Sequence, residues 1–184
     1  MFTVSLGDDG AELCPLEPWQ AQEFLAHMDR ARDLVDPWIP FAGRATDIPS
    51  ATALLQSYAD KQAADTGRIY GIRLDGTLVG GVLFRIFDAE TGNCEIGCWL
   101  EAAAEGRGLV TRAATKLIDW AVDVRGVHRV EWMASSANTR SVAVAERLGM
   151  TREGVLRQAY PYRGVRHDEE IWAVLAPEWR SRRG

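Results

Sequence analysis

The pattern of hydrophobic and polar residues predicts strands and then helices in the first third of the chain. Short apolar runs at residues 3–6 and 11–16 are typical of strands, and a turn with glycine separates them. Apolar side chains then recur at helical spacing over residues 18–29 and 50–64. Residues 36–41 form an aromatic loop with a proline near each end, so we expect two helices separated by this loop.

Three strand-like runs follow, over residues 68–74, 78–87 and 93–100. The pair Asp75-Gly76 between the first two is typical of a two-residue hairpin turn. The connections between the runs are too short for the crossovers that parallel strands need, so an antiparallel meander is predicted.

The remaining chain alternates helices and strands. The pattern predicts a helix over 109–124, a strand over 129–134, a helix over 139–148, and final strands over 150–158 and 167–174. This order indicates an α+β fold (mixed α/β) around one central sheet. The length of 184 residues suits a single domain, spanning residues 1–184.

Composition and charge narrow the class of protein. With 47% hydrophobic and 26% charged residues, the chain can bury a core and remain soluble. We expect a cytoplasmic protein without membrane contact, because there is no signal-peptide pattern and no apolar run near the roughly 20 residues of a membrane span. The net charge of −5 argues against nucleic-acid binding. The three cysteines, Cys14, Cys94 and Cys98, lack partners at metal-ligand spacing, so no metal is expected.

The segment 105–111 is the most informative stretch for function. Gly106 and Gly108 allow a tight turn directly before the helix that begins at Leu109. The first turn of a helix presents unpaired N–H groups and the positive end of the helix dipole, which together suit a phosphate or diphosphate. A helix start without a ligand explains this short motif equally well. A dinucleotide-binding unit would need a third glycine, and a P-loop would need Gly-Lys-Ser/Thr.

A second predicted strand, over 129–134, is also followed by polar residues and then a helix. Asn138 follows the predicted strand, Ser141 lies in the first helical turn, and Gly149 closes the helix. Capping alone explains Asn138 and Gly149. It does not explain why polar groups follow both strand ends.

Together these segments resemble the GNAT superfamily of N-acetyltransferases, and more narrowly its ribosomal-protein N-terminal (Rim-type) branch. The resemblance spans nearly the whole chain, and its order and spacing are more specific than any single motif. The segments that carry it are 38–41, 95–100, 106–112, 128–130, 138–141, 146–150, 153–157 and 168–172. The chain departs from the family pattern at Glu105, Val110 and Cys98, and Glu105 places a negative charge near the expected phosphates.

The resemblance implies a central, mostly antiparallel twisted sheet flanked by helices, and an acetyl-CoA co-substrate. Backbone amides over 107–111 would hold the diphosphate, and the pantetheine arm would pair with the strand edge at Trp99 and Leu100. The residues expected to bind the coenzyme are Trp99, Leu100, Gly106, Arg107, Gly108, Leu109, Val110, Thr111, Asn138 and Ser141.

The implied reaction is direct attack of a primary amine on the thioester. We expect Glu95 to act as the general base and the Ser141 hydroxyl to donate to the departing sulfur. Tyr160 and Tyr162, in a predicted loop, are rival donors. Trp38, Phe41 and Tyr160 are expected to form an apolar wall of the acceptor site, although core packing would explain Trp38 equally well.

The sequence leaves several alternatives open. The acceptor could be a protein N-terminal amine or a small amine, and a homo-oligomer is left open. A larger acyl group such as succinyl would be favoured if Arg85 or Arg163 lay near the acyl end. A CoA-binding regulatory module without turnover would keep the glycine turn but would not need Glu95 or Ser141.

Overall fold

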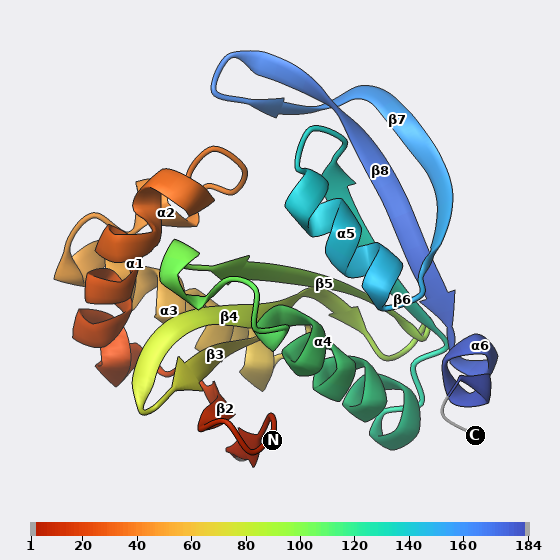
Figure 1. The fold of residues 1–184 in the computed structure, drawn as a ribbon, viewed down its shortest axis with the longest axis horizontal. Coiled ribbons are helices and arrows are strands. Elements are labelled where there is room, and N and C mark those ends of the chain that lie inside the picture. The colour runs from red at the N-terminus through yellow and green to blue at the C-terminus, as the bar shows by residue number, and fades with distance from the viewer. Residues whose placement is uncertain (1–2, 183–184) are drawn as a thin grey trace.

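A computed structural model describes residues 3–182 and shows one eight-stranded sheet covered by helices on both faces (Figure 1). The strands are β1 (Val4–Ser5), β2 (Ala11–Pro15), β3 (Arg68–Leu74), β4 (Thr77–Asp88), β5 (Asn93–Leu100), β6 (Arg129–Ser135), β7 (Thr151–Tyr162) and β8 (Val165–Leu175). The helices are α1 (Ala21–Val35), α2 (Phe41–Arg44), α3 (Ile48–Ala63), α4 (Leu109–Asp119), α5 (Thr139–Arg147) and α6 (Ala176–Ser181). Short 3₁₀ turns at Pro18–Gln20 and Ala102–Ala104 and a π-helical turn at Trp120–Val124 complete the elements.

The sheet is antiparallel except at one place. Its strand order is β1-β2-β3-β4-β5-β6-β8-β7, and only β5 and β6 run parallel. The predicted α+β class, the mostly antiparallel sheet and the meander over β3, β4 and β5 are confirmed. Asp75 and Gly76 form the predicted hairpin turn, both with positive φ, at 50° and 78°.

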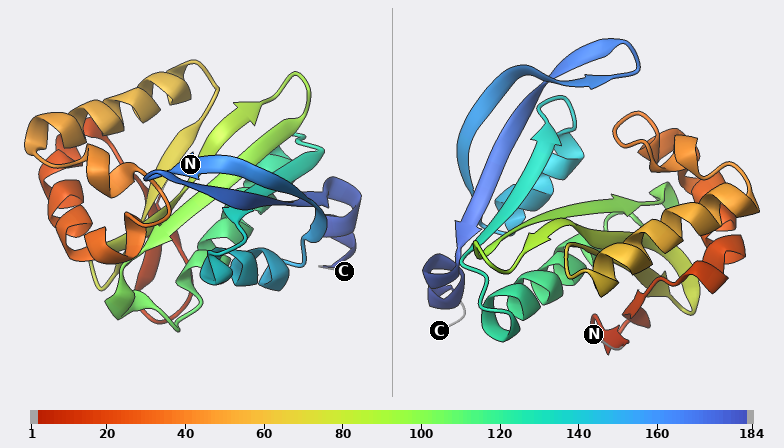
Figure 2. Two further views of the ribbon diagram at one scale, coloured as in Figure 1. Left: turned by 90° about the horizontal axis from the view of Figure 1, so that it is seen from above. Right: turned by 180° about the vertical axis from the view of Figure 1, so that it is seen from behind.

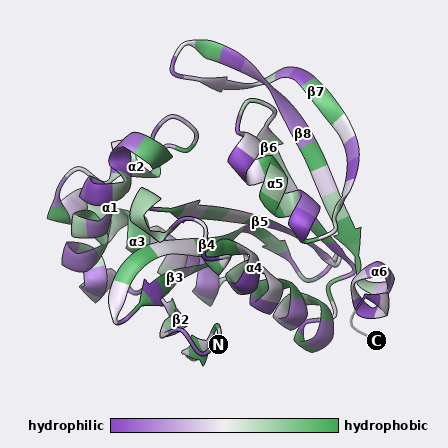
Figure 3. Cartoon of the chain, viewed as in Figure 1, coloured by the Kyte–Doolittle hydropathy of each residue, from purple (hydrophilic) through white to green (hydrophobic). Residues whose placement is uncertain are grey.

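Each face of the sheet has its own hydrophobic core. Helices α1, α2 and α3 pack on one face, with Leu83 and Trp99 from the sheet. Helices α4 and α5 pack on the other face, with Ile96 and Trp132 from the sheet. Figure 2 shows these two layers from above and from behind, and Figure 3 shows hydrophobic central strands beside more hydrophilic outer helix surfaces. The two cores place different elements on the two sides of β5 and β6.

The last hairpin is longer than the sequence suggested. We placed Tyr160 and Tyr162 in a loop, but β7 continues through Tyr162 and pairs with β8 up to the turn. The prediction was wrong because a register shift between Leu156 and Tyr160, with Gln158 at a φ of 54°, hides the strand pattern. Helices α2 and α6 were not predicted either, because they are short, with four and six residues respectively. Within residues 3–182, no helix has the length and apolar character needed to span a membrane.

Candidate active site

The strands β5 and β6 diverge like a wedge beyond a short junction, and we call the gap between the two backbones the opening. The two strands pair over only three positions, Asn93 with Arg129, Cys94 with Val130 and Glu95 with Glu131. Beyond Glu95, β5 pairs only with β4, and beyond Glu131, β6 pairs only with β8. Figure 1 shows the two strands diverging beyond this junction, with α4 and α5 beside them. The edge of β5 over residues 96–100 is therefore open to an added strand-like ligand.

The start of α4 offers unpaired backbone donors beside this opening. Gly106 and Gly108 have φ values of 78° and 68°, in the left-handed region that favours glycine. A Cβ atom at either position would meet nothing within 4 Å, so the turn faces open space. No side chain caps α4, and among residues 3–182 no acceptor contacts the N–H groups of residues 109–111. The predicted glycine turn and helix start are present.

Charged side chains fix this turn. The Arg112 guanidinium donates to the Arg107 carbonyl at 3.1 Å and pairs with Asp9 at 2.7 Å. Glu105, which departs from the family pattern, is paired with Arg140 at 3.3 Å, so its negative charge is balanced. Arg140 belongs to α5, and this ion pair links the starts of the two helices.

The start of α5 presents Ser141 in a defined orientation. The Asn138 side chain caps the helix, accepting from the Ser141 amide at 3.3 Å. The indole Nε1 of Trp132 donates to the Ser141 Oγ at 3.0 Å. Because an indole N–H can only donate, the serine oxygen is the acceptor and its own proton remains available. Asn138 therefore has the capping role that the sequence allowed, and Ser141 has a hydroxyl free to donate.

Glu95 lies on the opposite side of the sheet from Ser141. Its neighbours Cys94 and Ile96 are in the core under α4, so Glu95 faces the α1–α3 side. Glu95 is only 6% exposed and is paired through both carboxylate oxygens with Arg85. Glu95 is therefore an ion-paired, buried carboxylate rather than a free one.

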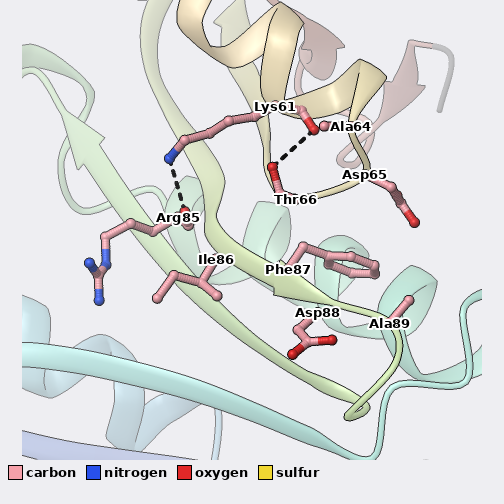
Figure 4. Close-up of a pocket in the computed structure, with 9 residues that line it drawn as sticks. All are labelled: Lys61, Ala64, Asp65, Thr66, Arg85, Ile86, Phe87, Asp88 and Ala89. Atoms are coloured by element: carbon pink, nitrogen blue, oxygen red, sulfur yellow. Dashed lines mark hydrogen bonds between the residues drawn. The ribbon is translucent and has the colours of Figure 1, made fainter.

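Arg85 reaches Glu95 because of a bulge. It is the extra residue where the β4–β5 register shifts between Phe84 and Ile86. Figure 4 shows Arg85 in the lining of a pocket that also includes Lys61 and Thr66, with Lys61 donating to the Arg85 carbonyl. The hydrogen bond to Glu95 raises the pKa of Arg85. Sequence reasoning named Arg85 as a possible acyl-group contact, and its place in an ion pair could not be read from the local pattern.

Trp99 is fixed by a buried polar network. Its indole Nε1 donates to Nε2 of His27 at 3.0 Å, and His27 Nδ1 contacts Glu101 at 3.2 Å. His27 is fully buried, and burial lowers its pKa to about 4, so the imidazole is neutral near pH 7. The side chain of Trp99 is therefore held under α1, and only its main chain can face the opening. His27 was not singled out from the sequence.

The aromatic residues predicted for the acceptor site come together in part. The Tyr160 hydroxyl donates to the Trp38 carbonyl at 2.9 Å, and the Trp38 ring lies 6.4 Å from the His167 ring. Phe41 is buried and packs edge-on against Trp99 at 5.4 Å, so it belongs to the core of the α1–α3 side.

The hairpin is joined to the loop before α2. The Tyr162 hydroxyl donates to the Asp36 carbonyl at 2.8 Å, next to the Tyr160 contact, and Arg163 pairs with the Asp36 carboxylate. Figure 2 shows the hairpin tip reaching this loop. The described residues contain no group of three or more His, Cys, Asp or Glu placed to hold a metal ion.

The chain matches a family model described as "Acetyltransferase (GNAT) domain" over residues 12–151. The Bacillus subtilis protein named "Putative ribosomal N-acetyltransferase YdaF" is 30% identical over 98% of this chain and 99% of its own length.

Solved structures agree with these matches. A microcin self-immunity acetyltransferase, MccE, in complex with acetyl-CoA and AMP, is 26% identical, covers 91% of this chain and 93% of its own, and has a TM-score of 0.85. The fold is also that of the ribosomal-protein alpha-N-acetyltransferase RimL in complex with coenzyme A, with a TM-score of 0.89 over 94% of this chain and 97% of the other, at 18% identity.

Proposed function

We propose that this chain, which belongs to the GNAT family of acetyltransferases, moves the acetyl group of acetyl-CoA to the primary amine at a protein N-terminus. The observation that carries the proposal is the opening between β5 and β6, flanked by two helix starts. A thioester placed there would be reached from the α1–α3 side of the sheet, where the acidic and aromatic side chains gather.

The coenzyme would bind mainly through the backbone. The unpaired N–H groups of residues 107–111 and the positive end of α4 suit its diphosphate. The pantetheine arm, which contains amides, would pair with the open edge of β5 at Trp99 and Leu100. The acetyl group would then lie in the opening, with Ser141 on the side of the helix starts.

Ser141 suits the departure of the thiolate. Attack by the amine forms an N–C bond and breaks the C–S bond, so negative charge develops on sulfur. The Ser141 proton is free to donate because the Trp132 indole already occupies the oxygen as an acceptor. No Ser-His-Asp arrangement is invoked, because the amine attacks the thioester directly.

A protein N-terminus as acceptor is supported by the name of the Bacillus subtilis relative, "Putative ribosomal N-acetyltransferase YdaF". A small amine is the second candidate. It is favoured by the hydrogen bonds of Tyr160 and Tyr162 to the loop before α2, which close one side of the acceptor region.

A larger acyl group is less well supported. Arg85 is occupied by Glu95, and Arg163 is occupied by Asp36, so neither guanidinium is free for a succinyl carboxylate.

Release of the CoA thiol tests the proposal. Purified protein with acetyl-CoA should release thiol when peptides with a free N-terminus are added, and the same peptides with a blocked N-terminus should give none. Small amines and succinyl-CoA in parallel reactions distinguish the acceptor and acyl alternatives. Tight CoA binding by calorimetry without thiol release from any acceptor would contradict the proposal and favour a binding module.

A further inference from the structure

We propose that Glu169, rather than Glu95, is the catalytic base that accepts a proton from the acceptor ammonium. The inference rests on the proposed function, because it assigns a residue to the amine that the reaction consumes. In the sequence, Glu169 lies within the segment 168–172 that carries the family resemblance, and its position in the fold points to this role.

The register of β8 directs Glu169 toward the acceptor side. The Trp172 indole donates to Glu170 at 2.9 Å, so these two side chains share one face of β8. Trp172 pairs with Trp132, whose indole contacts Ser141 on α5. Because successive side chains on a strand point to opposite faces, Glu169 points to the α1–α3 side.

Glu169 also lies beside the opening. Its backbone partner on β6 is Ser135, the last residue of the strand that forms one side of the wedge. Its partner on β7 is Leu156, four residues before Tyr160. This position is close to the wide end of the wedge, whereas Glu95 lies at the narrow end, where β5 and β6 still pair.

The two carboxylates differ in their partners. Both oxygens of Glu95 accept from Arg85. Throughout residues 3–182, no hydrogen bond or ion pair reaches the Glu169 carboxylate, although the residue is half-buried. To contact an acceptor ammonium, Glu95 would have to give up a hydrogen bond from the Arg85 guanidinium, which holds both of its oxygens. Among the described residues, the Glu169 carboxylate has no such partner to give up.

The surrounding charges favour this role. Burial raises the pKa of the Glu169 carboxyl, the Glu95 carboxylate raises it further, and Arg85 opposes the rise. A raised pKa brings a carboxylate closer to neutral pH, where a general base is most effective. The titratable and charged groups on this side come from β4, β5, β6, α2, α3, β7 and β8, and they include Arg85, Glu95, Glu131 with its partner Arg129, Arg44, Tyr58, Tyr160, Tyr162 and His167.

The proton balance is complete without a further reactant. The acceptor enters as an ammonium ion, and Glu169 takes one of its protons, which frees the nitrogen lone pair. The nitrogen attacks the carbonyl carbon, and the C–S bond breaks. The second nitrogen proton passes through water to the sulfur, whose charge the Ser141 hydroxyl stabilises, and Glu169 returns its proton to solvent. The products are the amide, CoA thiol and one released proton.

The test is the pH profile of Glu169→Gln, measured as thiol release with acetyl-CoA and the best acceptor peptide. We expect kcat/KM at pH 7 to fall by about 100-fold, the lower end of what a general base contributes. The variant should recover toward wild-type activity as the pH rises through the pKa of the acceptor amine, because solvent then removes the proton. A residue needed only for structure would show no such recovery.

Controls separate the possible outcomes. Glu131→Gln removes a carboxylate from the same face at the narrow end of the wedge and should keep wild-type kcat/KM, and CoA affinity should be unchanged in both variants. A Glu169→Gln enzyme within about threefold of wild type at pH 7 would overturn the inference, as would a large loss with alkaline recovery in Glu95→Gln instead. Failure of the proposed function itself would show differently, as a wild-type protein that releases no thiol.

Discussion

The two sides of the opening between β5 and β6 are built in different ways. On the α4–α5 side, the polar groups are mostly backbone N–H groups at the starts of two helices, of which α4 follows Gly108 and α5 is capped by Asn138. On the α1–α3 side, they are side chains that come from distant parts of the sequence, such as Arg85, Glu95 and Tyr160. A backbone site depends on local turns. A side-chain site depends on strand register, a bulge and buried hydrogen bonds, so it should respond more strongly to changes far from it.

The largest effect should come from pH acting on the buried network under Trp99. His27 has an ordinary pKa of 6.5 that burial lowers to about 4. Above pH 6.5 it is neutral in the folded and unfolded chains. As the pH falls from 6.5 to 4, only the unfolded chain gains the proton, so the free energy of unfolding should fall by about 3 kcal/mol. Urea unfolding at a series of pH values measures this.

Matched histidine variants sharpen that experiment. His27→Gln can still accept from Trp99 and donate to Glu101 but does not titrate, so its stability should depend less on pH. His128→Gln changes an exposed histidine and should keep the wild-type dependence. An equal slope in wild type and His27→Gln would contradict the assignment.

The backbone side should be broken by a side chain in the glycine turn. Gly108→Val fills open space at a φ of 68°, and we expect CoA to bind roughly 100-fold more weakly by calorimetry, a loss of about 2.7 kcal/mol. Gly126→Val is the control, because Gly126 has a φ of 70° and open surroundings but lies outside the opening. Equal loss of affinity in both variants would mean that backbone strain, rather than a blocked site, is responsible.

A smaller effect is expected at Ser141. Ser141→Ala should lower kcat about 10-fold, equivalent to about 1.4 kcal/mol, because the departing sulfur loses a donor. CoA affinity should change little, since the diphosphate would be held elsewhere. The stability of Ser141→Ala should be measured by urea unfolding as well, because the substitution also removes the acceptor of the Trp132 indole. Wild-type turnover in Ser141→Ala would mean that this hydroxyl has no part in the mechanism. Ser136→Ala is the control and should leave kcat unchanged.

The smallest effect should come from the contact between the hairpin and the loop before α2. Tyr160→Phe removes one hydrogen bond to the Trp38 carbonyl, worth about 1 kcal/mol, and should raise KM for the acceptor about threefold without changing CoA affinity. Tyr162→Phe removes the matching bond to Asp36 nearer the turn and should have a still smaller effect. A change in CoA affinity in either variant would show that the two sides of the opening are not independent.

The comparison also explains which features the sequence could predict. Asp75-Gly76, Gly106, Gly108 and Asn138 act through their own backbone geometry, so their residue types indicate the turns and helix starts. The strand over 93–100 was predictable for the same reason, because a strand has a fixed period, and in it Glu95 and Cys94 face opposite sides of the sheet.

Long-range features were not predictable in this way. The bond from Trp99 to His27 joins residues 72 positions apart. The pairing of Arg85 with Glu95 needs a bulge that no residue type marks. The direction of Glu169 follows from how β8 pairs with β6, and a shift of one residue would reverse it. These features come from tertiary packing.

The short junction of β5 with β6 has a consequence for the stability of the folded protein. Only three residue pairs join β5 to β6 and so hold the two halves of the sheet together, and beyond them the two strands have no backbone pairing with each other. A coenzyme arm lying along β5 would supply backbone hydrogen bonds at the unpaired edge. A ligand that binds only the folded chain makes unfolding less favourable by mass action. The resistance of the enzyme to heat and to proteolysis would then rise and fall with the concentration of acetyl-CoA.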